Sequence, residues 1–213
     1  MEITRKKIVS FIFYTLGIFV LSLGVTMTLL SNLGAGGWDA LTANIAKLTG
    51  IQVGTGTFIL GIILVLLTSI LERKKPNLSA LLVSYITGIF INFWYYTIFN
   101  QIELENFEIR LVVVILGVII IGIGIGCAMI FVTNYPKNHT ETFIFAVAER
   151  LKTIYRTSKV GMDNTALILA LILGWVLKDF RNIGIGTILN TFCTGYIIHF
   201  ILPIIEKIYR KLS

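Results

Sequence analysis

Long apolar runs separated by short polar segments dominate the pattern of this chain. Six runs are long enough to cross a hydrocarbon layer about 30 Å thick as helices. They cover residues 8–31, 55–71, 78–99, 111–133, 164–177 and 183–205. Strands of a membrane barrel would instead alternate apolar and polar residues over about ten positions. The pattern therefore predicts an all-α polytopic membrane protein with six transmembrane helices, of which the fifth is the shortest.

The composition agrees with this prediction. Of the 213 residues, 56% are hydrophobic and 14% are charged, whereas a soluble domain carries about 25% charged residues. The net charge of +7 does not indicate a nucleic-acid partner, because 14 of the 18 Lys and Arg residues fall in the two terminal segments and in the loops after the second and fourth runs. By the positive-inside rule, both termini are then cytoplasmic, with the lipid bilayer as the partner.

The sequence shows no pattern typical of catalysis or of metal binding. Cys127 and Cys193 fall inside apolar runs, which predicts buried thiols rather than a disulfide framework. No Ser-His-Asp arrangement can be drawn, and the glycines near residue 184 lack the strand and the lysine of a phosphate-binding loop. We therefore expect no enzyme activity, no cofactor and no metal site.

The two halves of the chain repeat each other. Gly17 and Gly24 recur as Gly117 and Gly124. Further matched pairs follow at offsets of 102 and 107, namely Asn32 with Asn134, Asp39 with Glu141, and Asn92 with His199. Residues 1–105 and 106–213 thus form two units of three transmembrane helices each. Because three is odd, the second unit enters the membrane from the opposite side, which predicts inverted repeats of the kind found in secondary transporters.

Each unit carries an extra short helix after its first apolar run. In the first unit, apolar residues recur at helical spacing between Trp38 and Leu48, glycines precede them, and Gly50 is a suitable C-cap. The matching segment of the second unit, NYPKNHTETFIFAVAERL, has an apolar stripe that ends at Tyr155. The sequence leaves open whether these amphipathic helices lie on the membrane interface or re-enter the membrane.

The stretch NLGAGGWDAL, residues 32–41, gathers small and polar residues where the first short helix begins. Asp39 and its match Glu141 either complement a helix dipole or line a polar cavity between the units that holds a proton, a cation or a cationic solute. Asn92 and His199 lie inside apolar runs, where polar groups are candidate sites. Asp163 is interpreted as the N-cap of the fifth helix. The candidate substrate- or ion-binding residues are Asn32, Gly34, Gly36, Gly37, Trp38, Asp39, Asn92, Asn134, Glu141 and His199.

Three stretches of the chain resemble a known family. NLGAGGWDAL, GIQVGTGT at the second run and IGIGTILNTFCTG in the sixth are similar to segments of bacterial membrane proteins of the YczE/YyaS/YitT group, whose length and number of spans also match. In the second unit that family often has a G-x-P-x-D-like element where this chain has NYPKNHTE, so Pro136 and Glu141 match only loosely. The resemblance implies the fold of that group and a transporter-like role.

Two functions fit these observations. The first is a permease that moves a small molecule or ion by alternating access about a site between the units. The second is a non-transporting membrane partner, such as a substrate-capture subunit or an accessory protein of a biosynthetic complex. Six helices are few for a lone carrier, and a homodimer would remove that objection.

Overall fold

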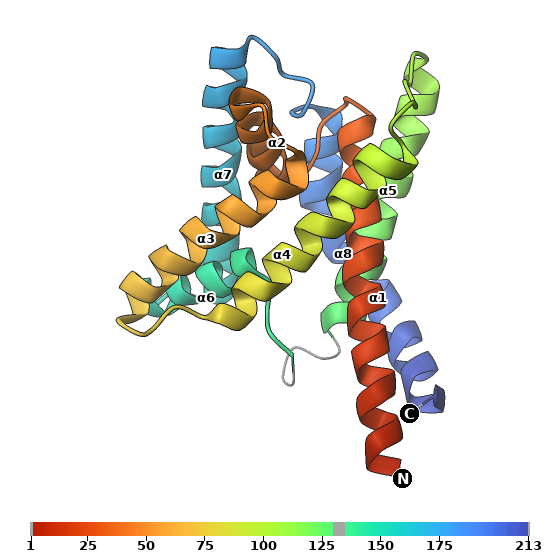
Figure 1. Ribbon diagram of the computed structural model, residues 1–213, viewed down its shortest axis with the longest axis vertical. Coiled ribbons are helices and arrows are strands. Elements are labelled where there is room, and N and C mark those ends of the chain that lie inside the picture. The colour runs from red at the N-terminus through yellow and green to blue at the C-terminus, as the bar shows by residue number, and fades with distance from the viewer. Residues whose placement is uncertain (1, 130–134, 213) are drawn as a thin grey trace.

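The computed structural model describes residues 2–129 and 135–212, which form eight α-helices, one π-helical segment and no β-strand. The first half contains α1 (Glu2–Leu30), α2 (Gly37–Thr49), α3 (Val53–Glu72) and α4 (Leu78–Asn92), which continues into the π-helical η1 (Phe93–Ile98). The second half contains α5 (Phe107–Met129), α6 (His139–Leu151), α7 (Tyr155–Leu177) and α8 (Ile185–Leu212). The two ends of the chain lie at the same end of the molecule (Figure 1).

Six of these helices are long and apolar enough to cross a membrane. They are Lys7–Leu30, Val53–Glu72, Leu78–Ile98, Phe107–Ala128, Tyr155–Leu177 and Ile185–Lys211. The prediction of an all-α protein with six long apolar helices is thereby confirmed, and the chain is a multi-pass membrane protein. The short helices α2 and α6 are not among the six spans.

The fifth spanning helix is longer than the sequence pattern indicates, and Asp163 is not its N-cap. Helix α7 begins at Tyr155, with Ile154 at the N-cap position, so Tyr155 does not belong to the short helix before it. The pattern conceals the first turns of α7 because they carry polar side chains. In the structure two of these side chains form an ion pair, with Lys159 Nζ 3.6 Å from Asp163 Oδ2. The predicted start at residue 164 is therefore wrong.

Helices α1 and α5 pack together through glycines. A Cβ on Gly24 would lie 2.7 Å from the Gly117 carbonyl oxygen and 2.6 Å from Ile121 N, and a Cβ on Gly17 would lie 3.0 Å from the Gly124 carbonyl oxygen. Distances this short leave no room for a side chain, so the two backbones are in direct contact. Because Gly17 meets Gly124 and Gly24 meets Gly117, the two helices run antiparallel.

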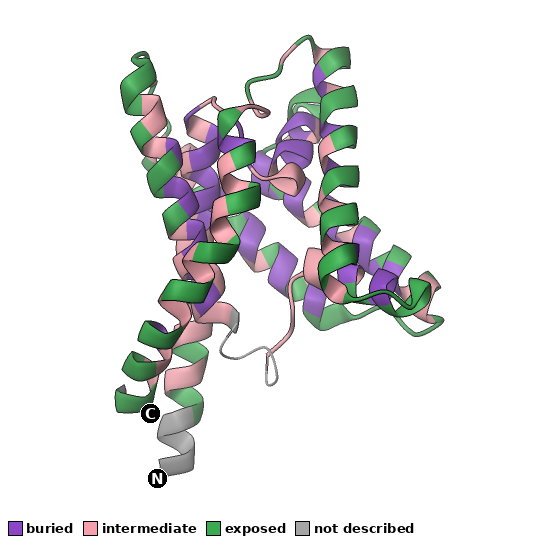
Figure 2. Cartoon of the chain, turned by 180° about the vertical axis from the view of Figure 1, so that it is seen from behind, coloured by how far each residue is buried: buried purple, intermediate pink, exposed green. Residues whose placement is uncertain are grey.

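The long helices that follow are packed unequally in the two halves. Helix α3 packs along α4, where the backbones of Gly54 and Gly88 meet and a Cβ on Gly61 would lie 2.6 Å from Ser84 Oγ. Helices α7 and α8 do not pack along each other in this way, and most of their length is exposed (Figure 2). Their exposed apolar side chains suit contact with lipid tails.

Each short helix packs against a long helix from the other half of the chain. Helix α2 lies on α7, where Asn44 Nδ2 donates a hydrogen bond to the Ala170 carbonyl oxygen at 2.8 Å. Helix α6 lies on α3, where a Cβ on Gly61 would lie 3.5 Å from the His139 ring. These crossed contacts bring the start of α2 next to the polar first turns of α7.

Candidate functional site

The turn between α1 and α2 is held in a special backbone conformation. Asn32 and Gly34 have positive φ angles of 51° and 109°, and a Cβ on Gly34 would lie 2.7 Å from Thr187 Oγ1. At position 34 the combination of this φ angle and this close contact is suited to glycine alone. The guanidinium of Arg110 donates a hydrogen bond to the Asn32 carbonyl oxygen at 2.6 Å. Asn32 and Gly34 therefore shape the turn through their backbones.

The first turn of α2 is fixed against the second half of the chain. A Cβ on Gly37 would lie 2.9 Å from the carbonyl oxygen of Asp163 in α7. The indole Nε1 of Trp38 donates a hydrogen bond to Asp163 Oδ1 at 2.9 Å. The same indole packs edge-on against Phe143 of α6, with ring centroids 6.5 Å apart. The candidate residues Gly37 and Trp38 of α2 thus contact α7, and Trp38 also contacts α6.

Four charged residues, Asp39, Glu141, Lys159 and Asp163, form what we call the charge cluster. Lys159 of α7 joins two of the carboxylates, since its Nζ lies 3.0 Å from Glu141 Oε1 and 3.6 Å from Asp163 Oδ2. The hydroxyl of Tyr155 donates to the other oxygen of Glu141. Glu141, predicted from the repeat, is therefore already paired within the second half of the chain.

Asp39 is the unpaired carboxylate of this cluster. Within residues 2–129 and 135–212 it has neither a hydrogen bond nor an ion pair, and its side chain is half-buried. A Cβ on Gly36 would lie 2.9 Å from Asp39 Oδ2 and 3.0 Å from the amide nitrogen of Asn190 in α8. Glycine at position 36 thus lets the side chains of Asp39 and Asn190 approach the backbone closely.

The surroundings of Asp39 favour its protonated form. Burial, and to a smaller extent the negative charge of Asp163, raise the pKa of Asp39 to about 7. A carboxyl group with such a pKa takes up and releases a proton near neutral pH. When all four groups are ionised, the cluster carries three negative charges and one positive charge, so it is suited to hold a proton or a cation.

His139 is a buried residue that the sequence analysis missed. Its Nδ1 lies 2.6 Å from Ser84 Oγ, at the junction of α4 and α6. Burial lowers the pKa of His139 to about 4, so the ring is neutral at physiological pH. It lies 102 residues after Gly37, and that repeat offset is the signal that could have found it. The neutral ring joins α6 to α4 through this hydrogen bond and is not part of the charge cluster.

Two of the predicted site residues lie away from Asp39, and one lies outside the described residues. Asn92 accepts a hydrogen bond from Gly54 N at 2.8 Å, so it satisfies a free backbone donor at the start of α3. His199 is exposed on α8, with Phe200 as its ring neighbour. Asn134 falls outside the residues that the structure describes. Asn92 and His199 therefore do not join the charge cluster.

Replacing Asn92 with Ala should destabilise the protein. The change leaves Gly54 N without its acceptor, which costs about 1–3 kcal/mol when the donor is buried. Thermal unfolding in detergent should show a melting temperature several degrees lower. The matched control is His199→Ala, which removes an exposed side chain and should shift stability by less than about 0.5 kcal/mol. Equal melting of the Asn92 variant and the natural protein would contradict the capping role.

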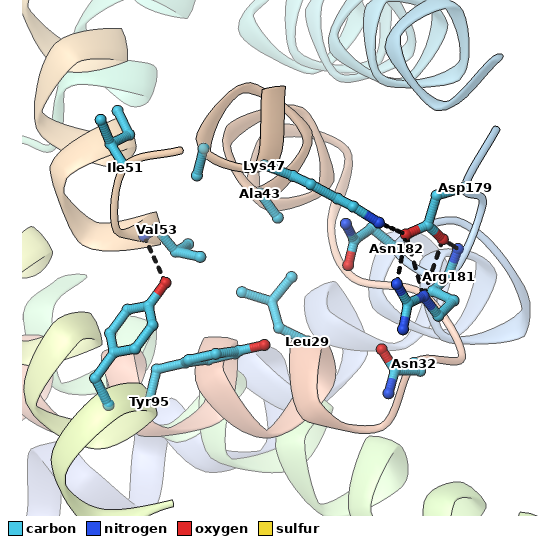
Figure 3. A pocket seen from close by; sticks show the side chains of 12 residues that line it. Leu29, Asn32, Ala43, Lys47, Ile51, Val53, Tyr95, Asp179, Arg181 and Asn182 are labelled. Atoms are coloured by element: carbon cyan, nitrogen blue, oxygen red, sulfur yellow. Dashed lines mark hydrogen bonds and ion pairs between the residues drawn. The ribbon is translucent and has the colours of Figure 1, made fainter. Parts of the chain in front are cut away.

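A second polar feature lies at the end of the molecule opposite the two termini (Figures 1 and 3). It is a pocket of about 220 Å³, which we call the distal pocket. Its lining residues come from both halves of the chain and are Leu29, Asn32, Ala43, Ala46, Lys47, Ile51, Val53, Tyr95, Tyr96, Asp179, Arg181 and Asn182. Of the predicted site residues that the structure describes, Asn32 alone lines it.

Ion pairs cross the distal pocket between α2 and the α7–α8 loop. Asp179 accepts hydrogen bonds from Lys47 Nζ and from Arg181 Nε and Nη2, the last at 2.8 Å. These bonds, with Arg181 as the main donor, hold the pKa of Asp179 well below its usual range. Asn182 Nδ2 also donates to Asn44 Oδ1 at 2.8 Å. Local sequence patterns do not reveal this network, because Lys47 lies 132 residues before Asp179.

Comparison with known proteins identifies relatives over nearly the whole chain. Residues 8–203 match the family described as "Family of unknown function (DUF6198)". The uncharacterized protein YyaS of Bacillus subtilis (strain 168) is 32% identical over 200 residues, which are 92% of this chain and 94% of the relative. The uncharacterized membrane protein YczE of the same organism is 30% identical, over 93% of this chain and 88% of the relative. No solved structure shows a significant match. The predicted resemblance to the YczE and YyaS proteins is thus confirmed.

Proposed function

The chain belongs to DUF6198, a family of unknown function, and we propose that it is a small-solute transporter of the bacterial inner membrane. The observation that carries this proposal is Asp39, an unpaired carboxylate with a pKa of about 7 at the contact between the two halves. An ionisable group kept in such a place is costly and usually serves a function. Asp39 is the proposed carrier of a coupling proton.

The proposed transporter consists of two inverted repeats, residues 1–105 and 106–213. Support comes from reciprocal contacts. Gly17 meets Gly124 while its repeat partner Gly117 meets Gly24, as expected for two helices related by a twofold axis. In the same way, α2 packs on α7 while α6 packs on α3. Such repeats place the substrate site at their interface, which is where Trp38, Asp39 and Asp163 lie.

The unequal packing of the two halves supports alternating access. In the first half α3 and α4 are closed on each other, whereas the matching helices α7 and α8 are apart. If the two repeats exchange these arrangements, the site at Asp39 becomes open to opposite sides of the membrane in turn. Helices α2 and α6 would then act as short re-entrant elements at the site.

The rival function is a non-transporting membrane partner, such as a substrate-capture subunit or an accessory protein of a biosynthetic complex. Partner proteins of this kind would bind solute without moving it. Flux of small solutes into liposomes that contain only this protein separates the two functions, because the rival gives binding without flux. The chain is proposed to act without a cofactor or a catalytic residue.

Both termini are proposed to face the cytoplasm. The prediction is that single cysteines placed at Asn106 and Lys178 react with a membrane-impermeant thiol reagent added to intact cells, because both positions then face outward. Cysteines at Lys75 and Lys152 should react only after the cells are opened. Cys127 and Cys193 are first replaced by Ala to remove background labelling. Labelling of Lys75→Cys in intact cells would show that the orientation is reversed.

A further inference from the structure

The distal pocket contains more positive than negative charge. Lys47 and Arg181 share a single carboxylate, Asp179. Arg110 adds a third cation nearby, with its Nε and Nη2 bound 2.6 Å from the carbonyl oxygens of Ser31 and Asn32. No other Asp or Glu is among the lining residues. The pocket is therefore an attractive place for an anion.

Donor groups in the pocket remain available. Arg181 uses Nε and Nη2 on Asp179, while its Nη1 has no protein acceptor among the residues that the structure describes. Among the residues that the structure describes, Lys47 Nζ pairs only with Asp179, so other N–H bonds of the ammonium have no protein acceptor there. The hydroxyl of Tyr95 points toward the middle of the pocket, and the Asn32 side chain lies below Arg181 (Figure 3).

Asp179 itself is poorly suited to bind a ligand. Both of its carboxylate oxygens already accept hydrogen bonds from Arg181, and Lys47 adds another to Oδ2. Since these bonds hold its pKa well below the usual range, it stays ionised and saturated. A cationic ligand would have to displace Lys47 or Arg181 to reach it. The free groups at this end of the pocket are thus donors.

The rest of the pocket is apolar and small. Side chains of Leu29, Ala43, Ile51 and Val53 line the rest of the pocket, with Ile51 and Val53 on the side away from Asp179 and Arg181 (Figure 3). The volume of about 220 Å³ is below the roughly 300–1,000 Å³ of pockets for drug-sized ligands. An anion that fits has one charged end and a short apolar body.

We propose that the distal pocket binds a small organic monocarboxylate, held by Arg181 and Lys47 with its apolar body against Leu29 and Val53. Guanidinium groups pair well with carboxylates, because their geometries match. This assignment deepens the proposed function and rests on it for the transport step alone: the carboxylate would be the solute that enters with the proton carried by Asp39. Binding itself requires only the pocket.

The test compares three probes of similar shape by isothermal titration calorimetry of the purified protein in an uncharged detergent. The probes are benzoate, benzylamine and benzyl alcohol. The expected result is binding of benzoate at neutral pH, with no binding of benzylamine and at most weak binding of benzyl alcohol. Binding of benzylamine in place of benzoate, or equal binding of benzoate and benzyl alcohol, would overturn the proposal.

Variants locate the binding site. Arg181→Gln should weaken benzoate binding roughly tenfold or more, because hydrogen bonds to a charged group contribute about 1.5–3 kcal/mol. Lys178→Gln is the matched control: it removes the same charge from an exposed residue of the same loop that does not line the pocket, and it should change binding less than about threefold, because exposed charges are screened. Equal losses of benzoate affinity in the two variants would overturn the assignment of benzoate to the distal pocket.

Arg181→Lys keeps the charge beside Asp179 and tests the site if Arg181→Gln does not fold. It should fold and still weaken binding, because lysine lacks the planar guanidinium. Undiminished benzoate binding by a folded Arg181→Lys protein would contradict the assigned role of the guanidinium. Benzoate binding in a protein that moves no solute would overturn the transport function and leave this site standing. Solute flux without carboxylate binding would overturn this site and leave the transport function standing.

Discussion

Replacing Asp39 with Asn is expected to abolish solute uptake driven by a pH gradient while leaving solute exchange across the membrane intact. Asparagine is nearly isosteric with aspartate but takes up no proton, so it removes the coupling and keeps the shape of the site. Exchange needs no net proton movement and should continue. The measurement is gradient-driven uptake and counterflow in liposomes, with the folded yield of each protein determined beside them.

Glu141→Gln is the comparison for Asp39→Asn. Glu141 already pairs with Lys159 and accepts from Tyr155, so its change should reduce stability and uptake together without separating uptake from exchange. If Asp39 only complemented the dipole of α2, Asn would serve almost as well. Uptake equal to that of the natural protein in both variants would rule out the coupling role.

The same substitution should remove a pH dependence of stability. The pKa of Asp39 is raised from 3.8 to about 7 in the folded protein, so the folded state binds this proton more tightly than the unfolded state. The contribution of Asp39 to stability is therefore fully present below about pH 4 and is lost as the pH rises toward 7. Asp39→Asn should flatten this part of the stability profile.

The second large effect is expected for Gly24→Leu. A Cβ at this position would meet backbone atoms of Gly117 and Ile121 at 2.7 and 2.6 Å, and backbone cannot move aside as a side chain can. Overpacking a tight contact costs about 1–3 kcal/mol and sometimes more, and here the whole α1–α5 interface must separate. We expect a loss of folded protein, measured as monodisperse yield and melting temperature after purification.

Gly195→Leu is the matched control for Gly24→Leu. Gly195 also lies within a spanning helix, but a Cβ there would meet no atom of a neighbouring part of the described chain within 4 Å. The larger side chain should therefore be accommodated, with yield and melting temperature close to those of the natural protein. If both substitutions were equally harmful, helix contact could not be the cause. If both were harmless, the α1 face would be open to lipid.

Most of the fold could be predicted because membrane insertion requires long apolar helices. The runs were read directly, whereas the contact of the α1 glycines with the α5 glycines is visible only in the structure. The start of α7 was concealed because Lys159 and Asp163 balance each other within the protein. Polar residues at a helix start resemble a loop in the sequence when their partners are unknown.

The candidate site could be predicted only in part. Trp38, Asp39 and Glu141 stood out as polar or aromatic residues at the starts of short helices. Their connection through Lys159 and Asp163 depends on α2 crossing onto α7, a tertiary contact that local patterns do not encode. Asn92 was a reasonable candidate by its depth in the membrane, but its side chain satisfies Gly54 N instead. A polar group in a membrane helix can serve the backbone as well as a ligand.

Counterflow into liposomes that contain only this protein tests the transport function most directly. The liposomes are loaded with an unlabelled carboxylate, amine or polyol, and a trace of the same labelled solute is added outside. At least one of these solutes is expected to accumulate transiently inside, with protein-free liposomes showing no accumulation. If none of the solutes enters faster than into protein-free liposomes, the protein is not a transporter of this kind, and the role of a non-transporting membrane partner stands in its place.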